Sequence, residues 1–187
     1  MRIVLVPGTF ANTDRHASQD EWWRPGSPFY REAKQRGIEC LSFAWSTELD
    51  GIIGRNDDWE KGAAGLYRQT KDLSALRIVA HSHGGNVVAY AAAKHGLRIL
   101  NLVTLATPVR KDIPYAEAKK NIRKWTHVYG GWRDYVQLAG SLFDGQVRFV
   151  RQMDDADQNI KVTGAGHSDL HEVRVWNESS LWSALED

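Results

Sequence analysis

Ser82 lies in a segment whose residue types favour nucleophilic chemistry. The apolar run Arg77–His81 predicts a strand, and the glycines after Ser82 lead into a predicted helix that begins near Asn86. A serine at such a turn has a strained backbone and a hydroxyl pushed out of the sheet. Strand and helix approach each other closely there, which requires small residues such as Ala80 and Gly84. We predict that Ser82 is a nucleophile; the alternative is a serine that only caps the helix.

A serine hydroxyl attacks a carbonyl only when a neighbouring base takes its proton. Among seven histidines, His167 stands out because it lies in a glycine-rich turn, Thr163–Leu170, after a short predicted strand at 160–162. The glycines allow this turn to carry an imidazole across the ends of the strands. His171 is the alternative base, but it has no glycine turn before it, and an ordinary loop histidine is the other alternative.

The elements that must position these residues alternate between strands and helices. Continuous apolar runs predict strands buried on both faces, at 3–6, 41–45, 78–81, 100–105 and 125–129. Helices between them have recognisable ends: Ser27-Pro28 with Gly37, a capping box at Asp57 and Glu60, and a stop at Gly96. This order predicts a single α/β domain over 1–187, with a doubly wound, mostly parallel sheet. Ligands bind such sheets at the carboxyl ends of the strands.

The segment from Ala80 to Gly84 resembles the nucleophile turn of the α/β-hydrolase superfamily, whose pattern is G-x-S-x-G. Ala80 replaces the first glycine of that pattern. The resemblance covers Ile3 to Leu170, without the first two strands of the family, and the turns and compact size look like those of small lipases and esterases. The crossover from Pro108 to Trp125 has room for about one helix, expected at 114–123. We therefore expect a minimal α/β-hydrolase fold without a cap domain.

The resemblance also implies the remaining parts of the site. The first strand ends in Pro7-Gly8, where the family has His-Gly, so the backbone amides of Thr9 (or Phe10) and His83 would form the oxyanion hole. The family's G-x-x-D pattern after the strand at 125–129 makes Asp134 the acid that orients His167. The chain order of serine, acid and histidine is that of this fold.

Other acids compete with Asp134 for this role. Asp112 follows the preceding strand, where some members of the superfamily keep an acid, and it is the main alternative. Asp144, Asp154 and Asp155 are further alternatives.

Two other features have more than one interpretation. His81 and His83 could form a metal pair, but the turn at Ser82 breaks the geometry, and we expect no metal site and no cofactor. His81 is expected to pack beneath the sheet. Trp22 and Trp23, together with Phe10, could line the rim of the substrate site, or the two tryptophans could cover the core under a long loop.

Net charge and the N-terminal sequence argue against a nucleic-acid-binding protein and against a membrane-spanning one. The formal net charge of +1 gives no field that favours nucleic acid, so we expect no nucleic-acid partner. The N-terminal apolar run ends at Pro7 and is too short for a signal peptide or a membrane span. We expect a cytoplasmic protein without integral membrane association.

The sequence as a whole predicts a serine hydrolase that cleaves small carboxylic esters through an acyl-enzyme, with Ser82, Asp134 and His167 as the triad. A thioesterase or acyltransferase that uses the same triad is an alternative. A catalytically silent relative that binds a ligand is another.

Overall fold

The computed structural model describes residues 1–8, 21–45, 56–131 and 151–186, and contains a six-stranded sheet. All strand pairs are parallel, in the order β2-β1-β3-β4-β5-β6. The strands are β1 (Arg2–Val6), β2 (Glu39–Ser42), β3 (Arg77–His81), β4 (Ile99–Leu105), β5 (Ile122–Gly130) and β6 (Gln158–Val162). The predicted doubly wound α/β fold is therefore confirmed.

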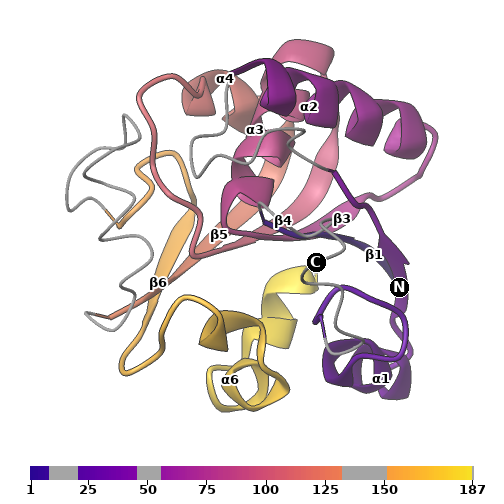
Figure 1. The fold of residues 1–187 in the computed structure, drawn as a ribbon, viewed down its shortest axis with the longest axis vertical. Helices are drawn as coiled ribbons and strands as arrows, with labels where there is room; N and C mark the ends of the chain where they lie inside the picture. The colour runs from indigo at the N-terminus through magenta and orange to yellow at the C-terminus, as the bar shows by residue number, and fades with distance from the viewer. Residues whose placement is uncertain (9–20, 46–55, 132–150, 187) are drawn as a thin grey trace.

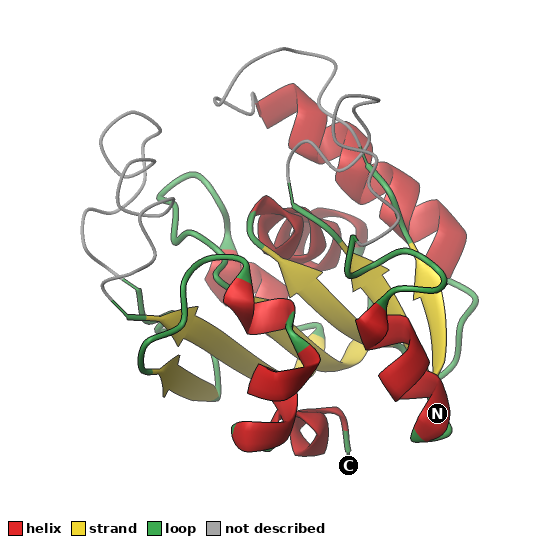
Figure 2. Cartoon of the chain, turned by 60° about the horizontal axis from the view of Figure 1, so that its bottom comes forward, coloured by secondary structure: helices red, strands yellow, loops and turns green. Residues whose placement is uncertain are grey.

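Helices cover both faces of the sheet (Figures 1 and 2). The α-helices are α1 (Pro28–Gln35), α2 (Asn56–Thr70), α3 (His83–His95), α4 (Tyr115–Lys119) and α6 (Val173–Glu178), and short 3₁₀ helices span Asp169–His171 and Leu181–Leu185. Figure 1 shows α2, α3 and α4 on one face of the sheet and α1, α6 and the C-terminal segment on the other. The crossover from β4 to β5 contains the single short helix α4, as expected for a fold without a cap in this connection.

Residue alternation along the strands builds two separate cores. In β3, Ile78 and Ala80 join the cluster beneath α2 and α3, whereas Val79 joins the cluster with Phe29 and Trp176 on the opposite face. Successive side chains of a strand point to opposite faces, so an apolar run of this kind buries both.

Two predicted elements have bounds that differ from the structure by a few residues. The strand expected at 41–45 lies at Glu39–Ser42, because its pairing with β1 ends at Leu5; Trp45 instead donates its indole N–H to the Pro7 carbonyl at 2.8 Å. The helix expected at 114–123 ends at Lys119 because pairing with β4 extends the next strand back to Ile122.

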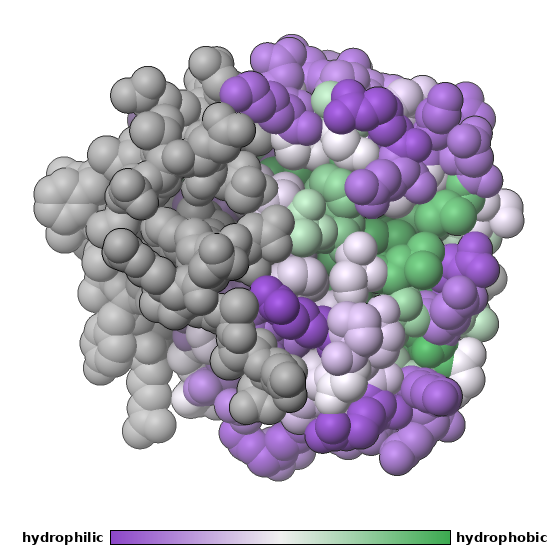
Figure 3. Space-filling view, turned by 45° about the vertical axis from the view of Figure 1, so that its right-hand side comes forward, coloured by the Kyte–Doolittle hydropathy of each residue, from purple (hydrophilic) through white to green (hydrophobic). Residues whose placement is uncertain are grey.

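The β2 edge of the sheet is covered by the segment around α1. The hydroxyl of Tyr30 donates to the Cys40 carbonyl at 2.6 Å, and the hydroxyl of Ser42 donates to the Trp23 carbonyl. These bonds occupy polar groups that a bare edge strand would present to other chains. On the side of the molecule that carries the N-terminus, apolar residues gather in a band between hydrophilic borders (Figure 3).

His127 in β5 is fully buried and belongs to a chain of hydrogen bonds. Its Nε2 lies 2.9 Å from the Arg151 carbonyl, which can only accept, so this nitrogen carries the proton. Its Nδ1 therefore accepts from the Thr104 hydroxyl at 2.9 Å, and that hydroxyl accepts from the Trp125 indole at 3.1 Å. Burial lowers the pKa of His127 to about 4, so the ring is neutral in the folded protein near neutral pH.

This burial predicts a loss of stability in mild acid. The unfolded chain binds a proton at His127 near pH ~6.5, whereas the folded chain does so near pH 4. As the pH falls between these values, proton uptake by His127 in the unfolded chain lowers the free energy of unfolding by up to about 1.4 kcal/mol per pH unit. Urea unfolding at about pH 7 and about pH 5 measures the difference. His127→Phe should be less stable at neutral pH yet show a smaller pH difference; an unchanged difference would contradict this origin.

Candidate active site

Ser82 forms the turn between β3 and α3 in a conformation that L-amino acids rarely adopt. Its φ is 52° and its ψ is −134°, and α3 begins directly after it at His83 rather than near Asn86 as predicted. Such backbone costs about 1–3 kcal/mol for a residue with a side chain, so the surroundings must hold it. Its amide donates to the Leu105 carbonyl at 2.8 Å, and its carbonyl accepts from Gly85 at 3.0 Å. The Ser82 side chain makes no capping bond to the helix, which argues against the simple capping role.

Small residues are required on the helix side of this turn. A Cβ on Gly84 would collide with the Pro7 carbonyl oxygen and lie 2.7 Å from the Val6 oxygen. A Cβ on Gly85 would collide with the side chain of Thr107. The first turn of α3 thus packs directly on the backbone at the end of β1. This contact explains the small residue that the sequence pattern requires at Gly84.

The turn after β1 meets the serine itself. A Cβ on Gly8 would lie 2.8 Å from the Ser82 Cβ and 3.4 Å from its Oγ. The His83 amide is the first of α3 and lies directly after Ser82. Gly8 and His83 therefore both adjoin Ser82. Thr9 and Phe10, predicted as oxyanion donor and as substrate rim, lie outside the described residues.

His167 is carried back from β6 by the predicted glycine turn. Gly164 has a φ of 84°, which favours glycine, and the Gly166 amide donates to the Asp169 carboxylate at 2.7 Å. The His167 ring lies 4.7 Å from the ring of His81, measured between centroids. The structure therefore brings His167 to the residue immediately before Ser82, although its strand is at the far edge of the sheet.

The acid predicted at Asp134 lies outside the described residues, but the start of its turn is described. The Arg151 guanidinium donates to the carbonyls of Gly130 and Gly131, which anchors the chain where β5 ends. Asp144 also lies outside the described residues.

The rival acid, Asp112, is already engaged. Arg110 donates two hydrogen bonds to its carboxylate, at 2.8 and 2.7 Å. These bonds hold the pKa of Asp112 below its ordinary value. An aspartate paired in this way has less capacity to orient a histidine.

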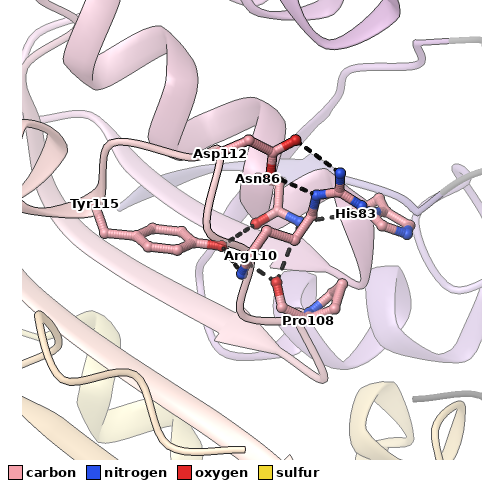
Figure 4. Close-up of polar contacts among 6 residues, drawn as sticks. All are labelled: His83, Asn86, Pro108, Arg110, Asp112 and Tyr115. Atoms are coloured by element: carbon pink, nitrogen blue, oxygen red, sulfur yellow. Dashed lines mark hydrogen bonds and ion pairs between the residues drawn. The ribbon is translucent and has the colours of Figure 1, made fainter. Parts of the chain in front are cut away.

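Figure 4 shows a polar network around Asn86, near Ser82, that the sequence did not predict. The Tyr115 hydroxyl donates to the Asn86 Oδ1 at 2.8 Å, and the Asn86 Nδ2 lies 3.3 Å from the Pro108 carbonyl and 3.4 Å from the His83 Nδ1. Arg110 packs 4.3 Å above the ring of Trp59. The network ties the first turn of α3 to the loop after β4. Asn86 is fully buried although it is polar, and no pattern in the sequence indicates its partners.

The predicted aromatic rim is part of the core. Trp22 and Trp23 are both buried, and Trp22 packs edge-on against Phe29 at 5.4 Å and stacks on His171 at 5.5 Å. The structure therefore favours the second interpretation of these tryptophans, as cover for the core. Trp22 also contacts the His81 ring, at 6.4 Å.

The two histidines around Ser82 diverge to opposite faces of the sheet. His81 contacts Trp22 in the cluster beneath α1, whereas the ring of His83 lies 5.5 Å from that of Trp59 in the cluster beneath α2 and α3. The turn separates the two rings, as expected from the sequence, and His81 packs beneath the sheet.

A hollow of about 680 Å³ lies at the other end of the strands. It is lined by the ends of α2 and α3 and the starts of β4 and β5, including Thr70, Gly96, Ile99 and Ile122. None of the lining residues belongs to the candidate site at Ser82.

The close contact at Gly84 predicts a severe effect of Gly84→Ala. The added methyl meets backbone oxygens that cannot rotate away, so the turn at Ser82 must shift. We expect a loss of at least about 2 kcal/mol in the free energy of unfolding, and a loss of activity. Gly65→Ala is the matched control, because its Cβ would lie 3.5 Å from Phe43 and alanine favours helices. Equal stability of the two variants by urea unfolding would refute the constraint.

Comparisons with known proteins agree with this architecture. The family model for the α/β-hydrolase fold matches residues 61–147. No curated protein matches the sequence. This match and the strand order described above are those of the α/β-hydrolase fold.

Solved structures with the same fold cover nearly the whole chain. A predicted CIB-like hydrolase from Thermoplasma acidophilum is 16% identical, with a TM-score of 0.59, and the match covers 98% of this chain and 84% of that one. An extracellular α/β-hydrolase from a Paenibacillus species is 10% identical, with a TM-score of 0.63 and full coverage of both chains. An α/β serine hydrolase homologue from Coxiella burnetii is 17% identical, with a TM-score of 0.59, covering 94% of this chain and 83% of that one.

In the described part of the chain, no helix has the length and apolar character needed to cross a membrane.

Proposed function

We propose that the protein is a serine hydrolase that cleaves small carboxylic esters through an acyl-enzyme. The observation that carries the proposal is the turn at Ser82: a non-glycine residue at φ 52°, with no capping bond and with Gly8 packed against it. A fold selected only for stability would place glycine there, because glycine adopts positive φ at little cost. The cost of a serine is explained if its hydroxyl reacts.

The neighbouring groups support each step of this chemistry. His167, whose loop reaches the end of β3, would take the proton of Ser82 as the hydroxyl attacks the ester carbonyl. The His83 and Thr9 amides would stabilise the oxyanion. Protonated His167 would then give its proton to the leaving alcohol, and a water molecule would hydrolyse the acyl-enzyme by the same steps. In this scheme Asp134 orients the imidazole.

Ser82→Ala provides the direct test. A fluorophosphonate probe should label the wild-type protein on Ser82, as located by peptide mass spectrometry, and should not label the variant. Hydrolysis of p-nitrophenyl butyrate should fall by roughly 10⁴-fold or more, because the triad acts as a unit. Labelling at Ser46, Ser141 or Ser168 would refute the assignment. Thioester and amide substrates in the same assay distinguish an esterase from a thioesterase.

The acid is tested by a pair of matched substitutions. Asp134→Asn should lower kcat by about 10⁴-fold with little loss of stability, because an amide can hold the histidine in the wrong tautomer. Asp112→Asn should leave kcat near the wild-type value, since Asp112 is bound by Arg110. Steady-state kinetics of both variants give the result, and exchanged phenotypes would move the acid to the loop after β4.

A further inference from the structure

His81, the last residue of β3, is enclosed by three aromatic rings. The ring centroids of His167, His171 and Trp22 lie 4.7, 5.0 and 6.4 Å from that of His81, all at steep interplanar angles. His81 has an exposed fraction of only 8%. A polar ring buried to this degree requires a hydrogen-bond partner.

That partner is the main chain of His167. The Nε2 of His81 lies 3.0 Å from the His167 carbonyl oxygen. The carbonyl only accepts, so His81 Nε2 carries the hydrogen and donates it. Burial, and then the nearby His167 and His171, lower the pKa of His81, so the ring is neutral and keeps this hydrogen at one nitrogen while Nδ1 stays unprotonated.

The bond joins two parts of the site that the sheet holds apart. β4 and β5 lie between β3 and β6, which places β6 about 14 Å from β3 at the usual strand spacing. The turn at 163–168 must span this distance to bring His167 near Ser82. Two other hydrogen bonds of this turn are local, from Ala165 to Val162 and from Gly166 to Asp169. The bond from His81, in contrast, joins the turn to β3, the strand that precedes the serine.

We propose that His81 is a positioning residue: its Nε2–H fixes the main chain of His167 to the strand of the nucleophile and so sets the place of the base. The expected effect on catalysis rests on the proposed function. The contact between His81 and His167 can be tested without an activity assay. Displacing a catalytic group by 1 Å costs about 10²-fold in rate. The bond should therefore affect kcat more than KM.

Two substitutions of similar size separate the hydrogen bond from packing. His81→Gln retains an N–H donor, whereas His81→Met fills the same space without one. We expect kcat for p-nitrophenyl butyrate to fall by about 10- to 100-fold in His81→Met, with KM within a few-fold of the wild-type value. His81→Gln should recover most of kcat, and fluorophosphonate labelling rates should follow the same order.

Asn101→Leu is the control for general loss of stability. Asn101 is buried and donates to the carbonyls of Ala184 and Glu186, on the same face of the sheet but at the opposite end of the strands. It should lower the melting temperature without changing kcat. If kcat falls in this variant as it does in His81→Met, the effect comes from stability and the proposal fails.

Hydrogen exchange of residues 163–168 tests the contact independently of catalysis. Exchange should be faster in His81→Met than in the wild-type protein or in His81→Gln. Equal exchange, or equal kcat in the Met and Gln variants, would overturn the positioning role. If Ser82→Ala hydrolyses the ester as fast as the wild-type protein, the esterase assignment fails. Hydrogen exchange alone then decides whether His81 holds this turn.

Discussion

The structure around the candidate site depends on the close packing of β1 against the first turn of α3. Gly84 meets the carbonyls at the end of β1, and Gly8 meets Ser82, so neither backbone can move without the other. Pairing of Val6 with Ala80 brings the two strands to this point in register. The positive φ of Ser82 persists because these contacts leave the chain no relaxed alternative.

The other parts of the site converge on the same end of the sheet from separate strands. β3 ends at His81, just before Ser82, β5 ends at Gly130, and the turn with His167 follows β6. The chain after β5 is held by Arg151, which donates to the Gly130 and Gly131 carbonyls, and the turn after β6 is held by His81, which donates to the His167 carbonyl. Hydrogen bonds from side chains to main-chain carbonyls therefore help to place the residues of the candidate site.

Local sequence patterns were sufficient to predict the strands and the turn at Ser82, because burial on both faces and close backbone approach each demand particular residue types. The glycine turn before His167 was likewise visible, with Gly164 at positive φ. The burial of Trp22 and the network of Asn86 with Tyr115 were not, because they arise from contacts between segments far apart in the sequence. The length of α4 was overestimated since strand pairing, and not helix propensity, decides where β5 begins.

The strand order has a consequence for the order in which the protein is assembled during synthesis. β1 and β2 are synthesised first, but one edge of β1 stays open until β3 appears, because Val4 pairs with Ile78 on that edge. Contacts between such distant residues form slowly, since the closing of long loops costs entropy. A nascent chain that ends before residue 77 therefore presents an unpaired apolar strand, the kind of edge that chaperones shield and that other chains can join. The residues around Ser82 acquire their geometry only when this gap is filled.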